Sequence, residues 1–315
     1  MANSESIGGV HSYVLYGAET TYNTAVATTT HIGLLNSYKS SIANNLAENR
    51  GFVGTTSGGR DVVKFTAGKL DLSGSFDFKI TNWAFMEYVL GTVAGSDPYT
   101  YTGANIPPSI TIAHNIDNPG SSATDLEETH SGTVIESVSI KSAVGEVTSC
   151  SVEFKSALAV VDTTLSSQVA LDDEDVYNFS GGSIELPSGT DLPNIIDSID
   201  VSIKNNQEIL FGVGSRLGVN ALPKERNYNI KVSLKYLDND LITAALGATT
   251  PTSDGTPTEY ATLVLNFVSG TRSMTMTFSG VPITDFAMTA DLNEVIGEDI
   301  SLTAKTLSAV EDNTV

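Results

Sequence analysis

The sequence predicts a mainly β protein: two tandem antiparallel β-sandwich or barrel domains, each with one short helix and one long loop. Three observations predict this fold class. Charged residues make up 17% of the 315-residue chain, and Ser, Thr, Gly and Asn take their place, which is typical of short strands joined by many turns. Apolar residues alternate with period two in many segments. Finally, parts of the first half of the chain recur in the second half.

The recurrence consists of three matches in the same order. Residues 69–91 and 225–247, about 156 residues apart, each hold an alternating strand and then an apolar stretch that ends in Leu-Gly. Residues 42–45 match 203–206, and residues 143–146 match 295–298, at nearly the same separation. About 155 residues is an ordinary domain size. We therefore expect a first domain over residues 1–160 and a duplicate domain over residues 161–315.

The elements of the first domain follow from alternation and turn residues. Residues 83–90 suit a short helix with Asn82 as its N-cap and Gly91 as its stop. Residues 134–141 and 146–156 suit a hairpin in which Val138 and Ile140 face Cys150 and Val152. An insertion is expected over residues 115–130. The other expected strands cover residues 10–16, 32–35, 70–80, 99–101 and 109–113.

The second domain is expected to repeat this order after an acidic boundary at residues 172–175. A short helix is predicted at residues 240–246. The predicted strands cover residues 182–186, 195–204, 228–236, 260–268, 274–279, 286–292 and 299–307. The tail, residues 311–315, is expected to be frayed.

Two glycine-rich, sparsely charged segments, residues 46–62 and 207–222, are predicted to be long loops at matching places in the two domains. Such segments can fold onto a neighbouring molecule and present backbone for strand addition. The alternative interpretation is a pair of ordinary surface loops. The candidate contact residues are Asn49, Gly51, Phe52, Val53, Gly54, Gly212, Val213, Gly214, Arg216 and Leu217.

Charge and composition exclude several classes of protein. The formal net charge of −21 repels phosphate and argues against gripping nucleic acid, but it suits a surface past which DNA must slide. The single cysteine, Cys150, cannot form an internal disulfide and fits a buried strand position. The first residues lack the pattern of a signal peptide, and no apolar run is long enough to span a membrane, so a soluble cytoplasmic product is expected.

No residue pattern points to catalysis or to a cofactor. The four histidines, His11, His31, His114 and His130, lack metal-ligand spacing and are expected at incidental polar positions near strand ends or loops. The acidic run at residues 172–175 is interpreted as solvated rather than as a calcium site. We therefore expect a protein without enzymatic activity, cofactor or metal.

Short motifs in the first hundred residues resemble a known family. Residues 17–25, Gly-Ala-Glu-Thr-Thr-Tyr-Asn-Thr-Ala, resemble the opening motif of tail tube proteins from tailed bacterial and archaeal viruses. Residues 69–78 resemble the Gly-containing strand of that family, and residues 90–101 resemble the segment that follows. One departure is Asn23, where the family favours Gly; Asn tolerates a left-handed backbone, so we expect the turn to survive.

This resemblance implies a major tail tube subunit of the virion, whose copies form stacked rings that conduct the genome DNA. The two loops would reach the next ring. A duplicated subunit would need three chains per ring for pseudo-sixfold symmetry, and acids on the lumen would repel passing DNA. The resemblance also implies assembly in the host cytoplasm, and as partners tape measure, baseplate and terminator proteins and, in some tails, a sheath. Alternatives are a baseplate or tail-completion protein, the inner tube of a virus-derived injection device, and a β-rich surface binding module.

Overall fold

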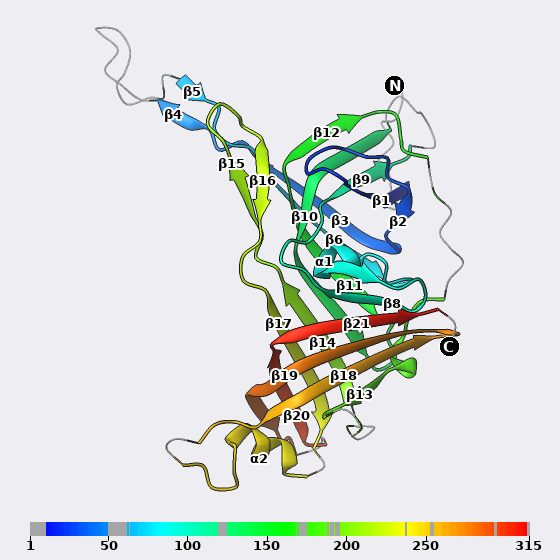
Figure 1. Ribbon diagram of the computed structural model, residues 1–315, viewed down its shortest axis with the longest axis vertical. Helices are drawn as coiled ribbons and strands as arrows, with labels where there is room; N and C mark the ends of the chain where they lie inside the picture. The colour runs from blue at the N-terminus through cyan, green and yellow to red at the C-terminus, as the bar shows by residue number, and fades with distance from the viewer. Residues whose placement is uncertain are drawn as a thin grey trace.

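The computed structural model describes residues 11–49, 62, 64–118, 125–167, 169, 175–187, 189, 192, 196–236, 238–252, 255–292 and 295–313. Within this described part the chain is mainly β, with antiparallel pairings and two short α-helices, which confirms the predicted fold class. Figure 1 shows an elongated molecule with most strands of the first half of the chain at one end and most strands of the second half at the other.

The longest sheet, here named the central sheet, has the strand order β3-β6-β11-β10-β14-β17-β20-β19, and all neighbours are antiparallel. Its first four strands are β3 (Leu34–Ala43), β6 (Asp71–Lys79), β11 (Ser149–Ser156) and β10 (Leu126–Ala143). Its last four are β14 (Ile196–Lys204), β17 (Asn227–Lys235), β20 (Gly297–Ala304) and β19 (Arg272–Thr289). The register places Val138 opposite Val152 and Ile140 opposite Cys150, as predicted.

Two smaller sheets continue from the ends of β10 and β19. The N-terminal sheet contains β2 (Thr30–His31), β1 (Ser12–Ala18), β9 (Ile110–Ile116), the start of β10, and β12 (Leu158–Asp162). The C-terminal sheet contains β7 (Gly91–Ala94), β8 (Tyr99–Gly103), β21 (Thr306–Asp312), the start of β19, β18 (Glu259–Ser269) and β13 (Ser183–Glu185). Because β10 and β19 each belong to two sheets, they connect the whole molecule.

The two helices end where glycine lets the backbone turn. The helix α1 (Met86–Leu90) is shorter than predicted, whereas α2 (Asp240–Leu246) has the predicted bounds. Gly91 and Gly247 follow them with φ of 110° and 77°, a left-handed conformation that favours glycine. Asn82 is not the N-cap of α1: that position is Phe85, and the Asn82 side chain instead accepts the Ala84 N–H.

Several other expectations need correction. Residues 32–35 were expected to form a short strand, yet β3 extends over ten residues to Ala43. The expected insertion at residues 115–130 is largely strand, because β9 extends to Ile116 and β10 begins at Leu126. The predicted loop 207–222 contains a hairpin, and residues 47–49 of the predicted loop 46–62 form a strand that pairs with residues 64–66; both hairpins are described below. The full lengths of β3 and β10 were not predicted, because polar residues fill many positions outside the predicted segments 32–35 and 134–141.

The core extends through both halves of the chain. A single cluster of buried apolar residues includes Trp83 and Phe78 from the first half and Phe267 and Phe278 from the second. The last strand also joins the halves: the buried Glu311 carboxylate accepts the Trp83 backbone N–H at 3.2 Å and the Tyr101 hydroxyl at 2.7 Å. Residues 311–313 are therefore held in place, and the expectation of a frayed tail is wrong for them.

Candidate assembly surfaces

Two β-hairpins project together from the body (Figure 1). The first arm is the hairpin of β4 (Ala47–Asn49) and β5 (Lys64–Thr66); the second arm is the hairpin of β15 (Glu208–Phe211) and β16 (Gly218–Leu222). Arg216, in the turn between β15 and β16, joins the second arm to the base of the first arm. Its Nε donates to the Gly68 carbonyl at 3.0 Å, its Nη2 donates to Asn44 Oδ1 at 2.8 Å, and its own carbonyl accepts the Leu70 N–H at 2.8 Å.

The predicted contact residues divide between these arms. Asn49 is exposed on β4 and its Nδ2 donates to Thr66 Oγ1. Gly212, Val213 and Gly214 form the exposed turn of the second arm, in which Gly214 has φ +91°. Leu217 is partly buried beside Arg216. The predicted residues Gly51, Phe52, Val53 and Gly54 lie outside the described residues.

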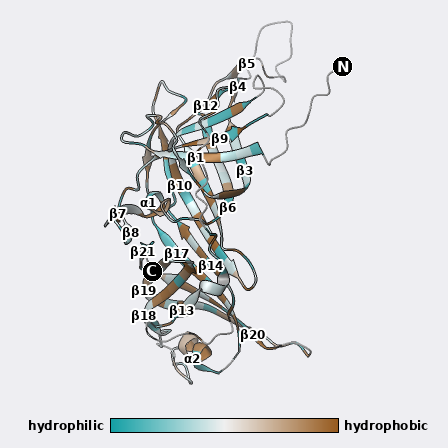
Figure 2. Ribbon diagram, turned by 90° about the vertical axis from the view of Figure 1, so that its right-hand side faces the viewer, coloured by the Kyte–Doolittle hydropathy of each residue, from teal (hydrophilic) through white to brown (hydrophobic). Residues whose placement is uncertain are grey.

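Two long strand edges of the central sheet lack a partner among the described residues. Strand β3 pairs only with β6, and residues 283–289 of β19 pair only with β20. Both edges carry exposed apolar side chains: Ile42 on β3 is 53% exposed and Met288 on β19 is 52% exposed. Figure 2 shows the hairpin of β19 and β20 extending from the lower part of the molecule.

Between these two edges, the halves of the chain are joined by the β10–β14 pairing, here named the internal junction. Ser137 lies opposite Lys204 and Ala143 lies opposite Ser198, so the pairing covers seven residues of each strand. Val138 and Ile203, which lie opposite each other, are both buried. The junction thus combines a full backbone ladder with an apolar inner face.

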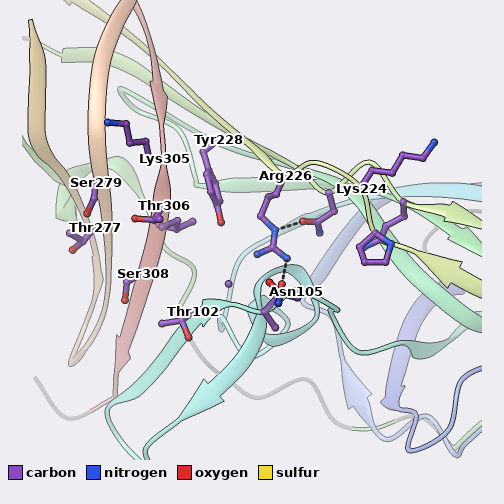
Figure 3. A pocket seen from close by; sticks show the side chains of 16 residues that line it. Thr102, Asn105, Lys224, Arg226, Tyr228, Thr277, Ser279, Lys305, Thr306 and Ser308 are labelled. Atoms are coloured by element: carbon purple, nitrogen blue, oxygen red, sulfur yellow. Dashed lines mark hydrogen bonds between the residues drawn. The ribbon is translucent and has the colours of Figure 1, made fainter.

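One buried asparagine fastens the internal junction. Asn205 follows β14, and its Nδ2 donates to the carbonyls of Val89 at 3.0 Å and Ile135 at 3.2 Å. Its Oδ1 accepts a hydrogen bond from Arg226 Nε at 2.8 Å, and Arg226 also donates a hydrogen bond to the Ala104 carbonyl at 3.1 Å. Figure 3 draws the two Arg226 hydrogen bonds as dashed lines. A buried amide with all of these groups paired fixes one register, because a shifted register would leave them unsatisfied.

Serine residues and balanced charges cover the face of the central sheet that points away from the core. Four carboxylates on this face each accept a serine hydroxyl from a neighbouring strand: the pairs are Ser37–Asp77, Ser137–Glu153, Ser139–Asp200 and Ser233–Asp299. Lysines alternate with these groups, at positions 39, 79, 141, 155, 204, 231 and 235. Despite the net charge of −21, this face is not acidic.

Two histidines lie inside strands rather than at strand ends or loops, which corrects the expectation for them. His114 on β9 and His130 on β10 are buried. The Tyr38 ring stacks on His114 at 3.8 Å, and Ser12 Oγ lies 2.6 Å from His114 Nε2. Burial lowers the pKa of His114 to about 4. His114 is therefore neutral near pH 7, packed in the wall of the core.

A family comparison identifies the class of protein. The model of the phage tail tube protein family matches residues 9–308, nearly the whole chain. The chain belongs to this family. A search of curated proteins found no match.

The opening motif of this tail tube protein is organised by one carboxylate. The buried Glu19 accepts hydrogen bonds from Ser109 Oγ at 2.7 Å, Thr111 Oγ1 at 2.9 Å, the Gly132 N–H at 2.8 Å and the Asn23 N–H at 3.0 Å. Asn23 has φ 57°, so the left-handed turn survives the departure from glycine, as predicted. The motif therefore ties the start of the chain to β9 and β10.

Nothing in the described part of this tail tube protein points to chemistry. No group of histidine, cysteine, aspartate or glutamate residues there could hold a metal ion, and of the acidic run only Asp175 is described. No helix in that part is both long and apolar enough to cross a membrane. The pocket in Figure 3, of about 550 Å³, is lined by Lys224 and Lys305, but Glu208 and Glu259 already pair with these lysines. The family points to a structural role.

Sequence reasoning located the arms through their glycine content but missed Asn44, Asn205, Arg226 and the two open edges. A signal for the asparagines was present, because the match between residues 42–45 and 203–206 contains both Asn-Asn pairs. The edges left no such signal, since the apolar residues of β3 do not alternate regularly with polar ones.

Proposed function

We propose that this protein is the major tail tube subunit, and that its copies close into rings which stack into a conduit for the genome DNA. The observation that carries the proposal is the pair of long open edges at the two ends of the central sheet. Other terminal strands, such as β2, β7, β12 and β13, have two to five residues, whereas β3 has ten. A long, partly apolar edge exposes unpaired backbone groups that a second chain can complete.

We also propose that the chain is a duplication, with the boundary moved from residue 160 to the end of β12 at Asp162. The pairing order supports this: β3-β6-β11-β10 and β14-β17-β20-β19 pair in the same sequence, and both series are followed by an antiparallel strand, β12 or β21. Val152 lies opposite Phe76 in the first unit, and Ile300 lies opposite Val232 in the second, so Val152 and Ile300 are equivalent residues. The sequence match of residues 143–146 to 295–298 was therefore four residues out of register.

Duplication leads to a ring of three chains. One edge of each kind per chain makes a head-to-tail contact, which yields a closed ring when the rotation closes. Three chains with two units each give pseudo-sixfold symmetry. The paired arms, being adjacent and exposed, would contact the next ring. Rings of this kind form in the host cytoplasm and meet the tape measure, baseplate and terminator proteins, and a sheath where the tail has one.

The central sheet would line the channel, since its two ends are the ones that close the ring. Its outward face then meets the DNA. The acidic lining expected from the net charge is not favoured by this face, on which lysines balance the acids. We propose instead that hydrogen-bonded serine–carboxylate pairs and nearby lysines give a neutral lining without a basic patch that would hold phosphate.

Electron microscopy of the purified full-length protein over a range of concentrations tests this proposal. We expect hollow rings or stacked tubes whose rotational average has threefold symmetry with six similar lobes. A protein that stays monomeric at high concentration, alone and with initiating tail proteins, would contradict it. Rings that cap a tube only once would instead indicate a baseplate or tail-completion protein.

A further inference from the structure

The internal junction contains the pattern for the contact between copies. We propose that β3 of one copy pairs with residues 283–289 of the next copy in the register of the β10–β14 pairing, and that Asn44 fastens this contact as Asn205 fastens the internal one. The inference rests on the proposed ring assembly and specifies its partner, a second copy of this chain, and its register.

The register follows from equivalent places in the sheet. Ile42 of β3 lies opposite Leu72, and Ile203 of β14 lies opposite Tyr228, at matching positions of β6 and β17. In β10 the ladder to β11 breaks between Ile135 and Ser137, and in β19 the ladder to β20 breaks between Ile283 and Asp285.

These equivalences carry the internal register over to the contact between copies. In the internal junction, Val138 lies opposite Ile203 and Ser139 lies opposite Ser202. At the contact between copies, the equivalent pairs are Phe286 opposite Ile42 and Ala287 opposite Ser41.

Exposure at the two edges agrees with a missing partner. Ile203 is fully buried in the internal junction, whereas its equivalent Ile42 is 53% exposed. Ile140 is buried, whereas its equivalent Met288 is 52% exposed. Apolar side chains that are buried at one junction and exposed at the equivalent edge are expected where the same contact is completed by another chain.

Asn44 is prepared for the role of Asn205. The Oδ1 of Asn205 accepts a hydrogen bond from Arg226, and the Nδ2 of Asn205 donates to two carbonyls. The Oδ1 of Asn44 likewise accepts a hydrogen bond from the Arg216 guanidinium, whereas the Asn44 Nδ2 has no hydrogen-bond partner among the described residues. The carbonyls equivalent to those of Val89 and Ile135 are those of Ala245 and Ile283, which we infer to be the acceptors in the next copy.

This arrangement also couples the sideways contact to the arms. Arg216 belongs to the second arm and holds Gly68 at the base of the first arm. Because the same guanidinium orients Asn44, the arms are positioned by the group that prepares the edge for the next copy.

Cysteine pairs test the register. Ser41 and Ala287 are both exposed, small and outward-facing, and in the inferred register they lie directly opposite each other in adjacent copies. The variant S41C/A287C should form disulfide-linked trimers on oxidation, since opposed residues have suitable Cα separations. The matched control S41C/M288C places one thiol on the other face and should not cross-link. The native Cys150 is buried and takes no part.

The asparagine is tested by Asn44→Asp, which keeps the acceptor for Arg216 and removes the donor. We expect the concentration needed for ring formation to rise about tenfold or more, with the melting temperature of the monomer unchanged. Asn178→Asp, the same change at an exposed residue on neither edge, should assemble like the parent protein.

The outcomes separate the two proposals. If the parent protein forms rings but S41C/A287C does not cross-link, the register is wrong. If it forms rings but Asn44→Asp assembles normally, the asparagine contact is wrong. In either case the tube function stands. If the parent protein forms no ring under any condition, both proposals fail.

Discussion

Asn45 and Asn206 turn the chain out of the central sheet into the two arms. Both have a left-handed backbone, with φ of 40° and 47°. The Nδ2 of Asn45 donates to the Lys69 carbonyl at 3.3 Å, and the Nδ2 of Asn206 donates to the Glu225 carbonyl at 2.7 Å. Asparagine suits this place because it tolerates the left-handed region and its amide can close the base of the hairpin. Single side chains therefore fix where each arm leaves the body.

At the residue scale, His114 predicts how stability depends on pH. Because burial lowers the pKa of His114 to about 4, the unfolded chain binds a proton below about pH 6.5 that the folded protein does not. The contribution of His114 to the free energy of unfolding is present above about pH 6.5 and is lost as the pH falls toward 4. Thermal melts of His114→Gln should therefore show a smaller drop in melting temperature between pH 7 and pH 5.

The control for this variant is His11→Gln, a change at an exposed histidine, which should leave the slope unchanged. Glu128 lies opposite His114. His130, whose Nε2 lies 3.3 Å from Glu128 Oε1, lowers the pKa of the Glu128 carboxyl, so the contribution of Glu128 to stability is lost only below the chosen pH range. An equal slope for parent and His114→Gln would rule out this origin.

At the scale of elements, the arms are held to each other and not only to the body. The hairpins are short: β4 and β5 have three residues each, and isolated two-stranded hairpins are marginally stable in water. Arg216 and the Lys69 ammonium, 5.3 Å from the centre of the Phe211 ring, supply contacts between them. Mutual support thus lets two weak hairpins project together from the body.

Arg216→Ala tests this support. We expect faster backbone hydrogen exchange and faster proteolytic cleavage in both arms, because the side-chain ties to Gly68 and Asn44 are lost. The global free energy of unfolding should fall by only about 1 kcal/mol, since the bonds are exposed. Arg216→Lys, which keeps the charge but loses the two-pronged geometry, should be intermediate. If hydrogen exchange became faster in the second arm alone, the two arms would be independent of each other.

At the scale of the whole molecule, the proposed ring makes the two ends of the central sheet complementary halves of one contact. The internal junction buries Ile203 and Ile140 within one chain, whereas the equivalent residues at the two ends, Ile42 and Met288, are exposed. The shared core joins the two halves of the chain, while a long edge at each end of the central sheet has no partner among the described residues. In the proposed ring, assembly would remove those edges from water.

The charge variant Ile42→Asp should abolish or strongly weaken ring assembly. Burying an isoleucine side chain contributes about 1.5–3 kcal/mol, and an uncompensated carboxylate at the contact adds a further penalty. Light scattering and electron microscopy would show the rise in the critical concentration, about tenfold for each 1.4 kcal/mol. Ile106→Asp, the same change at a 72% exposed residue in the loop before β9, should assemble normally. Normal assembly of Ile42→Asp would remove β3 from the contact.

The sequence predicted the elements whose partners lie in the same chain. Alternating residues in β6, β17 and β18 located those strands, and Leu-Gly located the ends of both helices. The pairs Val138–Val152 and Ile140–Cys150 were predicted because the hairpin is local. The family, too, could be recognised from short turn-rich motifs, because these encode local backbone geometry such as the left-handed Asn23.

Only the tertiary structure decided the rest: the extent of β3, the hairpin nature of the arms, the Arg216 tie between them and the Asn205 amide in the internal junction. These features depend on groups far apart in the chain, and a period-two pattern records only whether a side chain is buried within its own molecule. Strand β3 carries a weak pattern, and one of its edges has no partner among the described residues. By itself the sequence determined which strands and helices form; the folded chain decided which edges remain open, because an edge is defined by the pairings that all the other strands have already made.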